Sequence, residues 1–142
     1  MRFRGHTPAT VAYYVSYIAL GLSLAATGPN LSRLAEQTGS VLSEISYLFT
    51  AISLGYMAGA ALGGRLFDRI KGHPALALMM LVIAVFLALV PLASTLWMLI
   101  VVMFVLGAVQ SALDVGANTL LTWIHQDNLG PYMNALHFFF GV

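Results

Sequence analysis

The sequence predicts an all-α membrane protein with four transmembrane helices and the start of a fifth. Of its 142 residues, 60% are hydrophobic and only 8% are charged, whereas a soluble domain carries about 25% charged residues. A small chain cannot bury that much apolar surface in its own core, so the excess is expected to face a lipid bilayer. Four apolar runs have about the 20 residues that cross a hydrocarbon core, namely 9–28, 45–63, 75–93 and 96–121.

A fifth apolar run covers residues 131–142 and begins at Pro131, a residue suited to the first turn of a helix. Its roughly twelve residues are fewer than a membrane crossing requires. An isolated half-crossing would leave backbone groups without hydrogen-bond partners in lipid. We therefore expect residues 1–142 to be a truncated piece, a partial N-terminal transmembrane bundle that missing C-terminal helices or a partner chain complete.

The connections between the runs are short, which predicts antiparallel neighbours, and the basic residues divide unevenly among them. The first connection, 29–44, holds only Arg33. The N-terminus and the second connection, 64–74, hold the other five basic residues: Arg2, Arg4, Arg65, Arg69 and Lys71. The positive-inside rule then predicts a multi-pass protein of the cell (inner or plasma) membrane with a cytoplasmic N-terminus.

Composition also excludes several classes of function. A formal net charge of +1 provides no basic surface of the size that binding to nucleic acid requires. The absence of cysteine excludes disulfides, thiolate metal sites and a cysteine nucleophile. The sequence contains no Gly-x-Ser-x-Gly, no His-Glu-x-x-His, no phosphate-binding glycine loop and no second carboxylate within a span. We therefore expect neither an enzyme nor a bound cofactor.

Three glycines recur at intervals of four residues in the second span: Gly55, Gly59 and Gly63. Small residues at this spacing line one helix face and let a second backbone approach closely. The pattern predicts a helix-packing surface. The same close contact would also allow helices to slide or rock.

The fourth span carries a polar stripe, because Gln110, Asp114 and Asn118 also follow one another at intervals of four. A carboxylate in the middle of the bilayer costs about 2.5–3.5 kcal/mol on insertion scales, and such residues usually face the interior of the bundle. One interpretation is structural, with Gln110 or Asn118 holding Asp114 between helices. The other is functional: Asp114 takes up a proton, attracts a sodium ion or binds substrate hydroxyls. H⁺ and Na⁺ are thus the candidate coupling ions.

The first span supplies a further candidate, Tyr17. Tyr13 and Tyr14 lie near the predicted cytoplasmic boundary, where interfacial aromatic residues are common. Tyr17 lies deeper in the membrane and is expected to face a cavity.

The segment that follows the second span resembles a known signature. Gly64-x-Leu66-x-Asp68-Arg69 is similar to the loop motif of the major facilitator superfamily. It departs from that motif at Lys71, where the family has a second glycine. The resemblance implies the N-terminal six-helix bundle of a twelve-helix fold, in which Gly64, Asp68 and Arg69 form a gating loop that closes against the second half of the protein.

The fourth and fifth runs resemble one branch of that superfamily, which includes fucose permeases and sodium-dependent glucose transporters. The resemblance rests on Asp114 ahead of Asn118 and on Asn134-x-Leu136-His137. It implies a secondary transporter that moves a small solute, a sugar or polyol by preference, through alternating access. Asp114, Asn134 and His137 would then take part in coupling or in solute binding. The second acid that fucose permeases carry on their first helix has no counterpart here.

Two other functions fit parts of the pattern. A four-helix exporter that works as a dimer would exchange drugs for protons through one membrane carboxylate. A non-transporting membrane subunit would use Gly55, Gly59 and Gly63 for assembly alone. In that case Asp114→Asn would alter assembly but no solute flux.

Overall fold

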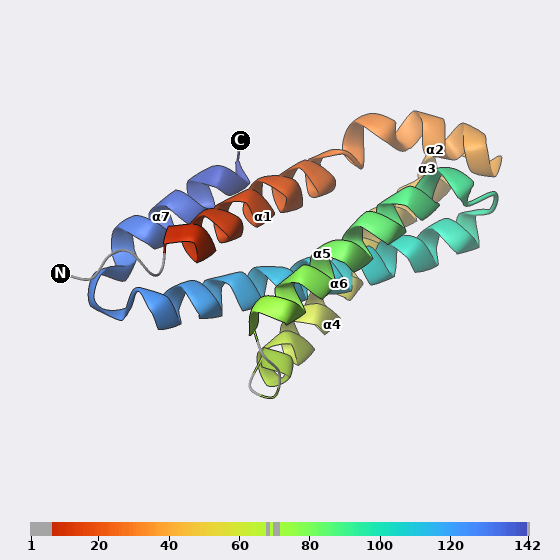
Figure 1. Cartoon of the computed structure of the whole chain (residues 1–142). Coiled ribbons are helices and arrows are strands. Elements are labelled where there is room, and N and C mark those ends of the chain that lie inside the picture. The colour runs from red at the N-terminus through yellow and green to blue at the C-terminus, as the bar shows by residue number, and fades with distance from the viewer. Residues whose placement is uncertain (1–6, 68, 70–71, 142) are drawn as a thin grey trace.

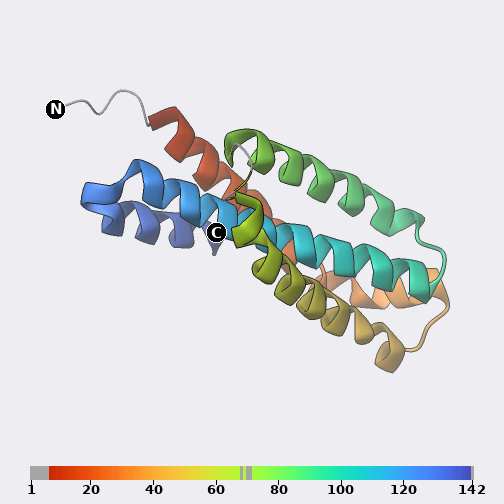
Figure 2. The same ribbon diagram turned by 90° about the horizontal axis from the view of Figure 1, so that it is seen from below.

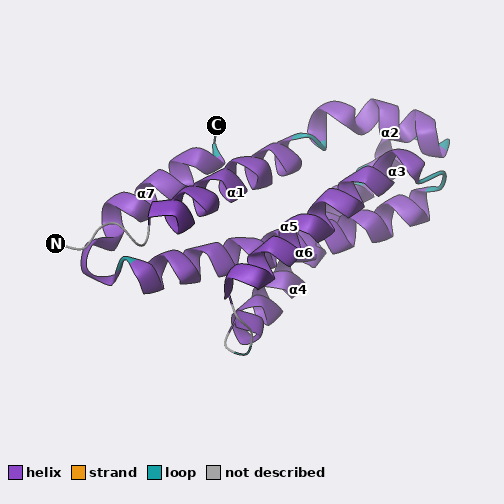
Figure 3. Ribbon diagram, viewed as in Figure 1, coloured by secondary structure: helices purple, strands orange, loops and turns teal. Residues whose placement is uncertain are grey.

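A computed structural model describes residues 7–67, 69 and 72–141 of the chain, and every regular element in this part is helical (Figure 3). In chain order the elements are α1 (Thr7–Ala25), a 3-10 helix (Gly28–Asn30), α2 (Leu31–Thr38), α3 (Leu42–Ile45), α4 (Tyr47–Phe67), α5 (Gly72–Leu89), a second 3-10 helix (Val90–Leu92), α6 (Leu96–Ile124), a third 3-10 helix (Gln126–Asn128) and α7 (Leu129–Phe140). The predicted all-α fold class is confirmed.

Four helical segments within the described residues are long and apolar enough to cross a membrane: Thr7–Thr38, Leu42–Arg65, Gly72–Leu92 and Leu96–Ile124. Each contains most of one predicted run. The fifth run is helix α7, which begins at Leu129, two residues before the predicted start at Pro131. The chain is therefore a multi-pass membrane protein.

The connection expected over residues 29–44 is largely helical, which corrects the prediction of a simple loop. Helix α2 ends at Thr38 and is capped by Gly39, whose φ of 64° lies in the left-handed region that glycine adopts without strain. The Nε2 atom of Gln37 in α2 donates hydrogen bonds to the carbonyl oxygens of Val90 (2.9 Å) and Ala93 (2.6 Å). These bonds join α2 to the connection between α5 and α6.

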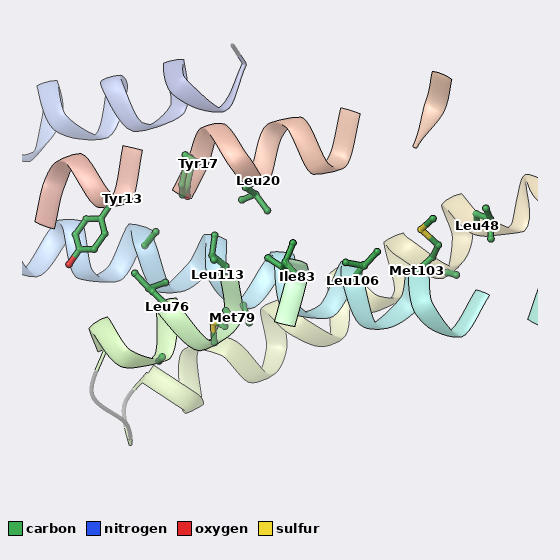
Figure 4. Packing of buried hydrophobic residues seen from close by; sticks show 14 of the residues in the cluster. Tyr13, Tyr17, Leu20, Leu48, Leu76, Met79, Ile83, Met103, Leu106 and Leu113 are labelled. Atoms are coloured by element: carbon green, nitrogen blue, oxygen red, sulfur yellow. The ribbon is translucent and has the colours of Figure 1, made fainter. Parts of the chain in front are cut away.

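Helix α6 is the centre of the bundle, since it contacts α1, α4, α5 and α7. Helix α1 also packs along α7. Figures 1 and 2 show α2 and the α5–α6 connection at one end of the bundle, with the N-terminal end of α1 and the α6–α7 turn at the other. Side chains from α1, α4, α5 and α6 share one buried apolar cluster (Figure 4).

Glycines bring α4 and α6 into backbone contact. A Cβ atom added at Gly55 would lie 2.0 Å from the carbonyl oxygen of Phe104, and one added at Gly59 would lie 2.0 Å from that of Ala108. At Gly63 the contact is looser, because the nearest atom, Cα of Ala112, would be 3.3 Å away. The glycine face of α4 thus lies directly against α6, where only residues without a side chain allow this separation.

Candidate functional site

The Asp114 carboxylate lies where three helices meet, and it accepts hydrogen bonds from each of them. On α1, the Tyr17 hydroxyl donates to Oδ1. On α6 itself, Nδ2 of Asn118 donates to the same oxygen over 2.9 Å. On α4, the Tyr56 hydroxyl donates to Oδ2 over 2.8 Å. Asn118 also donates to the Tyr17 hydroxyl, so the four side chains form one network, here called the Asp114 cluster.

Local structure explains how these side chains meet. Asp114 and Asn118 are one helical turn apart and therefore share a face of α6. Tyr17 enters from α1 and is only 1% exposed. Tyr56 directly follows Gly55, the residue that lets α4 approach the backbone of α6. The glycine face of α4 therefore brings the Tyr56 hydroxyl within reach of Asp114.

The hydrogen bonds of the Asp114 cluster offset part of the free energy that is lost when a carboxylate is removed from water into an apolar bundle. Hydrogen bonds to an ionised group are about twice as strong as bonds between neutral groups. Both Asp114 oxygens accept hydrogen bonds, so neither is left without a partner inside the bundle. A proton or cation that binds Asp114 would share these oxygens with the donors from Tyr17, Tyr56 and Asn118.

Gln110 belongs to a separate contact, although the sequence places it on one stripe with Asp114 and Asn118. Its Nε2 atom donates to the Ser23 hydroxyl of α1 over 2.9 Å. Gln110 is 2% exposed and Ser23 is 8% exposed. Of the two partners considered for Asp114, Asn118 makes a hydrogen bond to it and Gln110 does not.

Two candidates lie on α7, and one of them, His137, contacts the Asp114 cluster. The His137 ring packs edge-on against Tyr17, with 6.0 Å between the ring centroids. His137 and Asn134 are both exposed on α7. Neither makes a hydrogen bond to Asp114 in the part of the chain that the structure describes.

The predicted gating loop is shorter than the sequence suggested. Helix α4 continues to Phe67, so Gly64 lies within its last turn, and α5 already begins at Gly72. A Cβ atom added at Gly64 would meet nothing within 4 Å, in contrast to Gly55 and Gly59. Arg69 lies in an exposed turn, and Asp68 lies outside the described residues.

Tyr56 is the site residue that the sequence analysis missed. It lies in an apolar span beside the glycine pattern, where it breaks no periodicity. A signal was nevertheless available, because a tyrosine hydroxyl in a membrane span needs a hydrogen-bond partner. Among the described residues, no group of three or more histidine, aspartate or glutamate side chains could hold a metal ion.

Comparisons with known proteins identify related chains. Residues 13–142 match the family model of the Major Facilitator Superfamily. The chain is 36% identical over 129 residues to sodium-dependent glucose transporter 1A of Mus musculus, a match covering 91% of this chain and 30% of that protein. It is 37% identical over 127 residues to sodium-dependent glucose transporter 1 of Homo sapiens, covering 89% and 24%.

A third relative is major facilitator superfamily domain-containing protein 4A of Danio rerio, 32% identical over 142 residues, with coverage of 99% of this chain and 27% of that protein. No solved structure matches the chain. The chain thus spans less than a third of the length of these three relatives. Because the family model covers residues 13–142, this chain belongs to the major facilitator superfamily.

Proposed function

We propose that this chain forms the leading part of a secondary transporter that moves a sugar or polyol across a membrane by alternating access. Three features support the proposal: the family, the relatives named as sodium-dependent glucose transporters, and the Asp114 cluster. In this proposal the protein carries its solute across the membrane without changing it chemically, so it is a transporter and not an enzyme.

The observation that carries the proposal is the position of Asp114 between Tyr17, Tyr56 and Asn118. A ligand shifts a conformational equilibrium only when it binds one state better than the other. A coupling ion on Asp114 meets this condition, because it competes with hydroxyl donors from two other helices. Ion binding would loosen α1 and α4 from α6 and so favour one state of the transporter over the other.

Either H⁺ or Na⁺ can serve as the coupling ion. A proton would turn one Asp114 oxygen into a donor, which reverses its hydrogen bond with Tyr17 or Tyr56. A sodium ion would instead take the carboxylate, the Tyr17 oxygen and the Asn118 side-chain oxygen as ligands, since hard cations prefer oxygen. The names of the glucose-transporter relatives favour sodium.

The remaining candidates face the parts of the transporter outside this chain. Asn134 and His137 lie exposed on α7, with His137 against Tyr17, so both can contact solute or the helices of the second half. Gly64 lies in the last turn of α4, Arg69 lies in an exposed turn after it, and Asp68 directly precedes Arg69 in the sequence. We assign them to the gate that holds the two halves together.

The proposed orientation places the N-terminus in the cytoplasm of a cell that carries the protein in its inner or plasma membrane. Five of the six basic residues belong to the N-terminus, the last turn of α4 and the residues that follow α4, whereas Arg33 lies in α2 near the opposite end of the bundle. This distribution agrees with the positive-inside rule. The end of the bundle that carries α2 and the α5–α6 connection then faces the outside of the cell.

The experiment that tests the proposal is uptake of labelled D-glucose into proteoliposomes that contain the full-length protein. Separate Na⁺ and proton gradients are applied, with no gradient as the control. We expect accumulation with one gradient and its loss in Asp114→Asn, while the variant is inserted normally. Absence of uptake under both gradients, or normal accumulation in Asp114→Asn, contradicts the proposal.

A further inference from the structure

A cavity of about 250 Å³ opens between the outward ends of α1, α2, α5 and α6, on the far side of Gln110 from Asp114. Its apolar walls include Leu87, Met103 and Leu106. Ligand sites are commonly lined in this way, with a few polar groups that fix orientation and specificity. The cavity is large enough for a small molecule and not only for a single ion. The polar groups in its lining therefore indicate which class of molecule it can bind.

Three side-chain amides line the cavity, and their NH₂ groups already serve protein acceptors. Nδ2 of Asn30 donates to the Ala26 carbonyl over 2.8 Å, Nε2 of Gln37 donates to two carbonyl oxygens, and Nε2 of Gln110 donates to Ser23. The oxygens of these amides accept no hydrogen bond within the described residues. An amide oxygen has two acceptor sites, so the cavity offers acceptors to a ligand that carries hydroxyl donors.

The charges that line the cavity limit the class of ligand that it can bind. Arg33 also lines the cavity, and no carboxylate does among the described residues. A guanidinium with no carboxylate in the same cavity lining disfavours a cation, while amide oxygens disfavour an anion. A neutral polyhydroxylated solute suits both kinds of group, because its hydroxyl hydrogens can donate to the amide oxygens and its oxygens can accept from the Arg33 guanidinium.

The floor of the cavity lies close to the Asp114 cluster. Gln110 precedes Asp114 by four residues, which is about 6 Å along the axis of α6. The bond between Gln110 and Ser23 closes the floor by joining α6 to α1. Tyr17 reaches Asp114 from the same helix as Ser23. A solute in the cavity would therefore lie about one helical turn outward of the carboxylate.

We propose that this cavity is an outward-facing binding site for a sugar or polyol, separate from Asp114, with Asn30, Gln37, Gln110 and Arg33 as its polar contacts. This inference rests on the proposed function. The solute binds in this cavity before it reaches the Asp114 cluster, and the Gln110–Ser23 hydrogen bond lies between the cavity and the cluster.

The test uses cysteines introduced one at a time into a cysteine-free version of the full-length protein, since this chain itself contains none. Thr27→Cys places a thiol in the cavity lining. Ser94→Cys is the matched control, because Ser94 is exposed in the connection between α5 and α6 and lies outside the cavity lining. Each variant in intact cells is treated with a membrane-impermeant methanethiosulfonate reagent, with and without D-glucose.

We expect the reagent to label both cysteines and D-glucose to slow labelling at Thr27→Cys alone. Adding Gln110→Met should raise the D-glucose concentration for half-protection roughly three- to tenfold, the effect of one lost hydrogen bond. No labelling at Thr27→Cys, equal protection at Ser94→Cys, or protection unaffected by Gln110→Met would overturn the inference.

Uptake of D-glucose by the unlabelled Thr27→Cys variant distinguishes this inference from the proposed function. Transport without protection contradicts the cavity site and leaves the proposed function intact. Absence of both transport and protection contradicts both.

Discussion

The hydroxyl of Tyr56 donates a 2.8 Å hydrogen bond to Oδ2 of Asp114, which joins α4 to α6. Oδ1 of the same carboxylate receives Tyr17 from α1. The two oxygens of one side chain thus hold two different helices. A change in the charge of Asp114 acts on both links at once.

The first prediction concerns Tyr56→Phe, which keeps the aromatic ring and removes one donor to Asp114. A donor competes with a cation for the carboxylate oxygen, so its loss should make the coupling ion bind more tightly. A hydrogen bond to a charged group contributes about 1.5–3 kcal/mol, and about 1.4 kcal/mol corresponds to a tenfold change in binding. We expect the half-saturating ion concentration to fall roughly ten- to a hundredfold and turnover to fall with it, as measured by uptake kinetics.

Tyr47→Phe is the matched control for this prediction. Tyr47 lies on the same helix, is 59% exposed and makes no hydrogen bond through its hydroxyl in the described part of the chain. Its variant should behave as the wild type. Equal half-saturating concentrations in Tyr56→Phe and the wild type would show that Tyr56 has no role in coupling.

The second prediction concerns the contact between α4 and α6. Gly59→Ala places a Cβ atom where the carbonyl oxygen of Ala108 would lie 2.0 Å away, so the helices must separate. Overpacking of this kind costs typically 1–3 kcal/mol. We expect a lower melting temperature in detergent, measured by fluorescence-detected size-exclusion chromatography after heating.

Gly64→Ala provides the comparison, because a Cβ atom there meets nothing within 4 Å. This variant should keep the wild-type melting temperature or exceed it slightly, since alanine favours a helix more than glycine does. If both alanine variants melt at the same temperature, the close packing of α4 on α6 does not limit stability.

The third prediction concerns orientation. Ser94 and Gln126 are both exposed and lie in the connections at opposite ends of α6. With a cytoplasmic N-terminus, a cysteine at Ser94 should react with an impermeant thiol reagent in intact cells. A cysteine at Gln126 should react only after the membrane is opened. The reverse pattern would place the N-terminus outside.

The fold class could be predicted from sequence because membrane crossing imposes a simple length and composition rule. All four predicted runs fall largely within helices of sufficient length. Helix α2 could not be predicted in this way. Its eight residues, Leu31–Thr38, include Arg33, Glu36 and Gln37, and the search for long apolar runs passes over such a mixed segment.

The candidate site could be predicted only in part. Periodicity along one helix placed Asp114 and Asn118 on one face, and the structure joins them by a hydrogen bond. Contacts between helices do not follow from one helix's periodicity. For that reason the bond from Tyr56 to Asp114 and the pairing of Gln110 with Ser23 emerge only from the packed bundle. The functional roles of these residues stay predictions.

The measurement that tests the central claim most directly compares two modes of transport in Asp114→Asn, using the full-length protein in proteoliposomes. An amide fills the same space as the carboxylate but cannot exchange a proton or hold a cation by charge. If Asp114 couples the ion to the solute, the variant should lose gradient-driven accumulation of labelled D-glucose and keep exchange of labelled for unlabelled D-glucose. Accumulation at the wild-type level in Asp114→Asn would contradict the account.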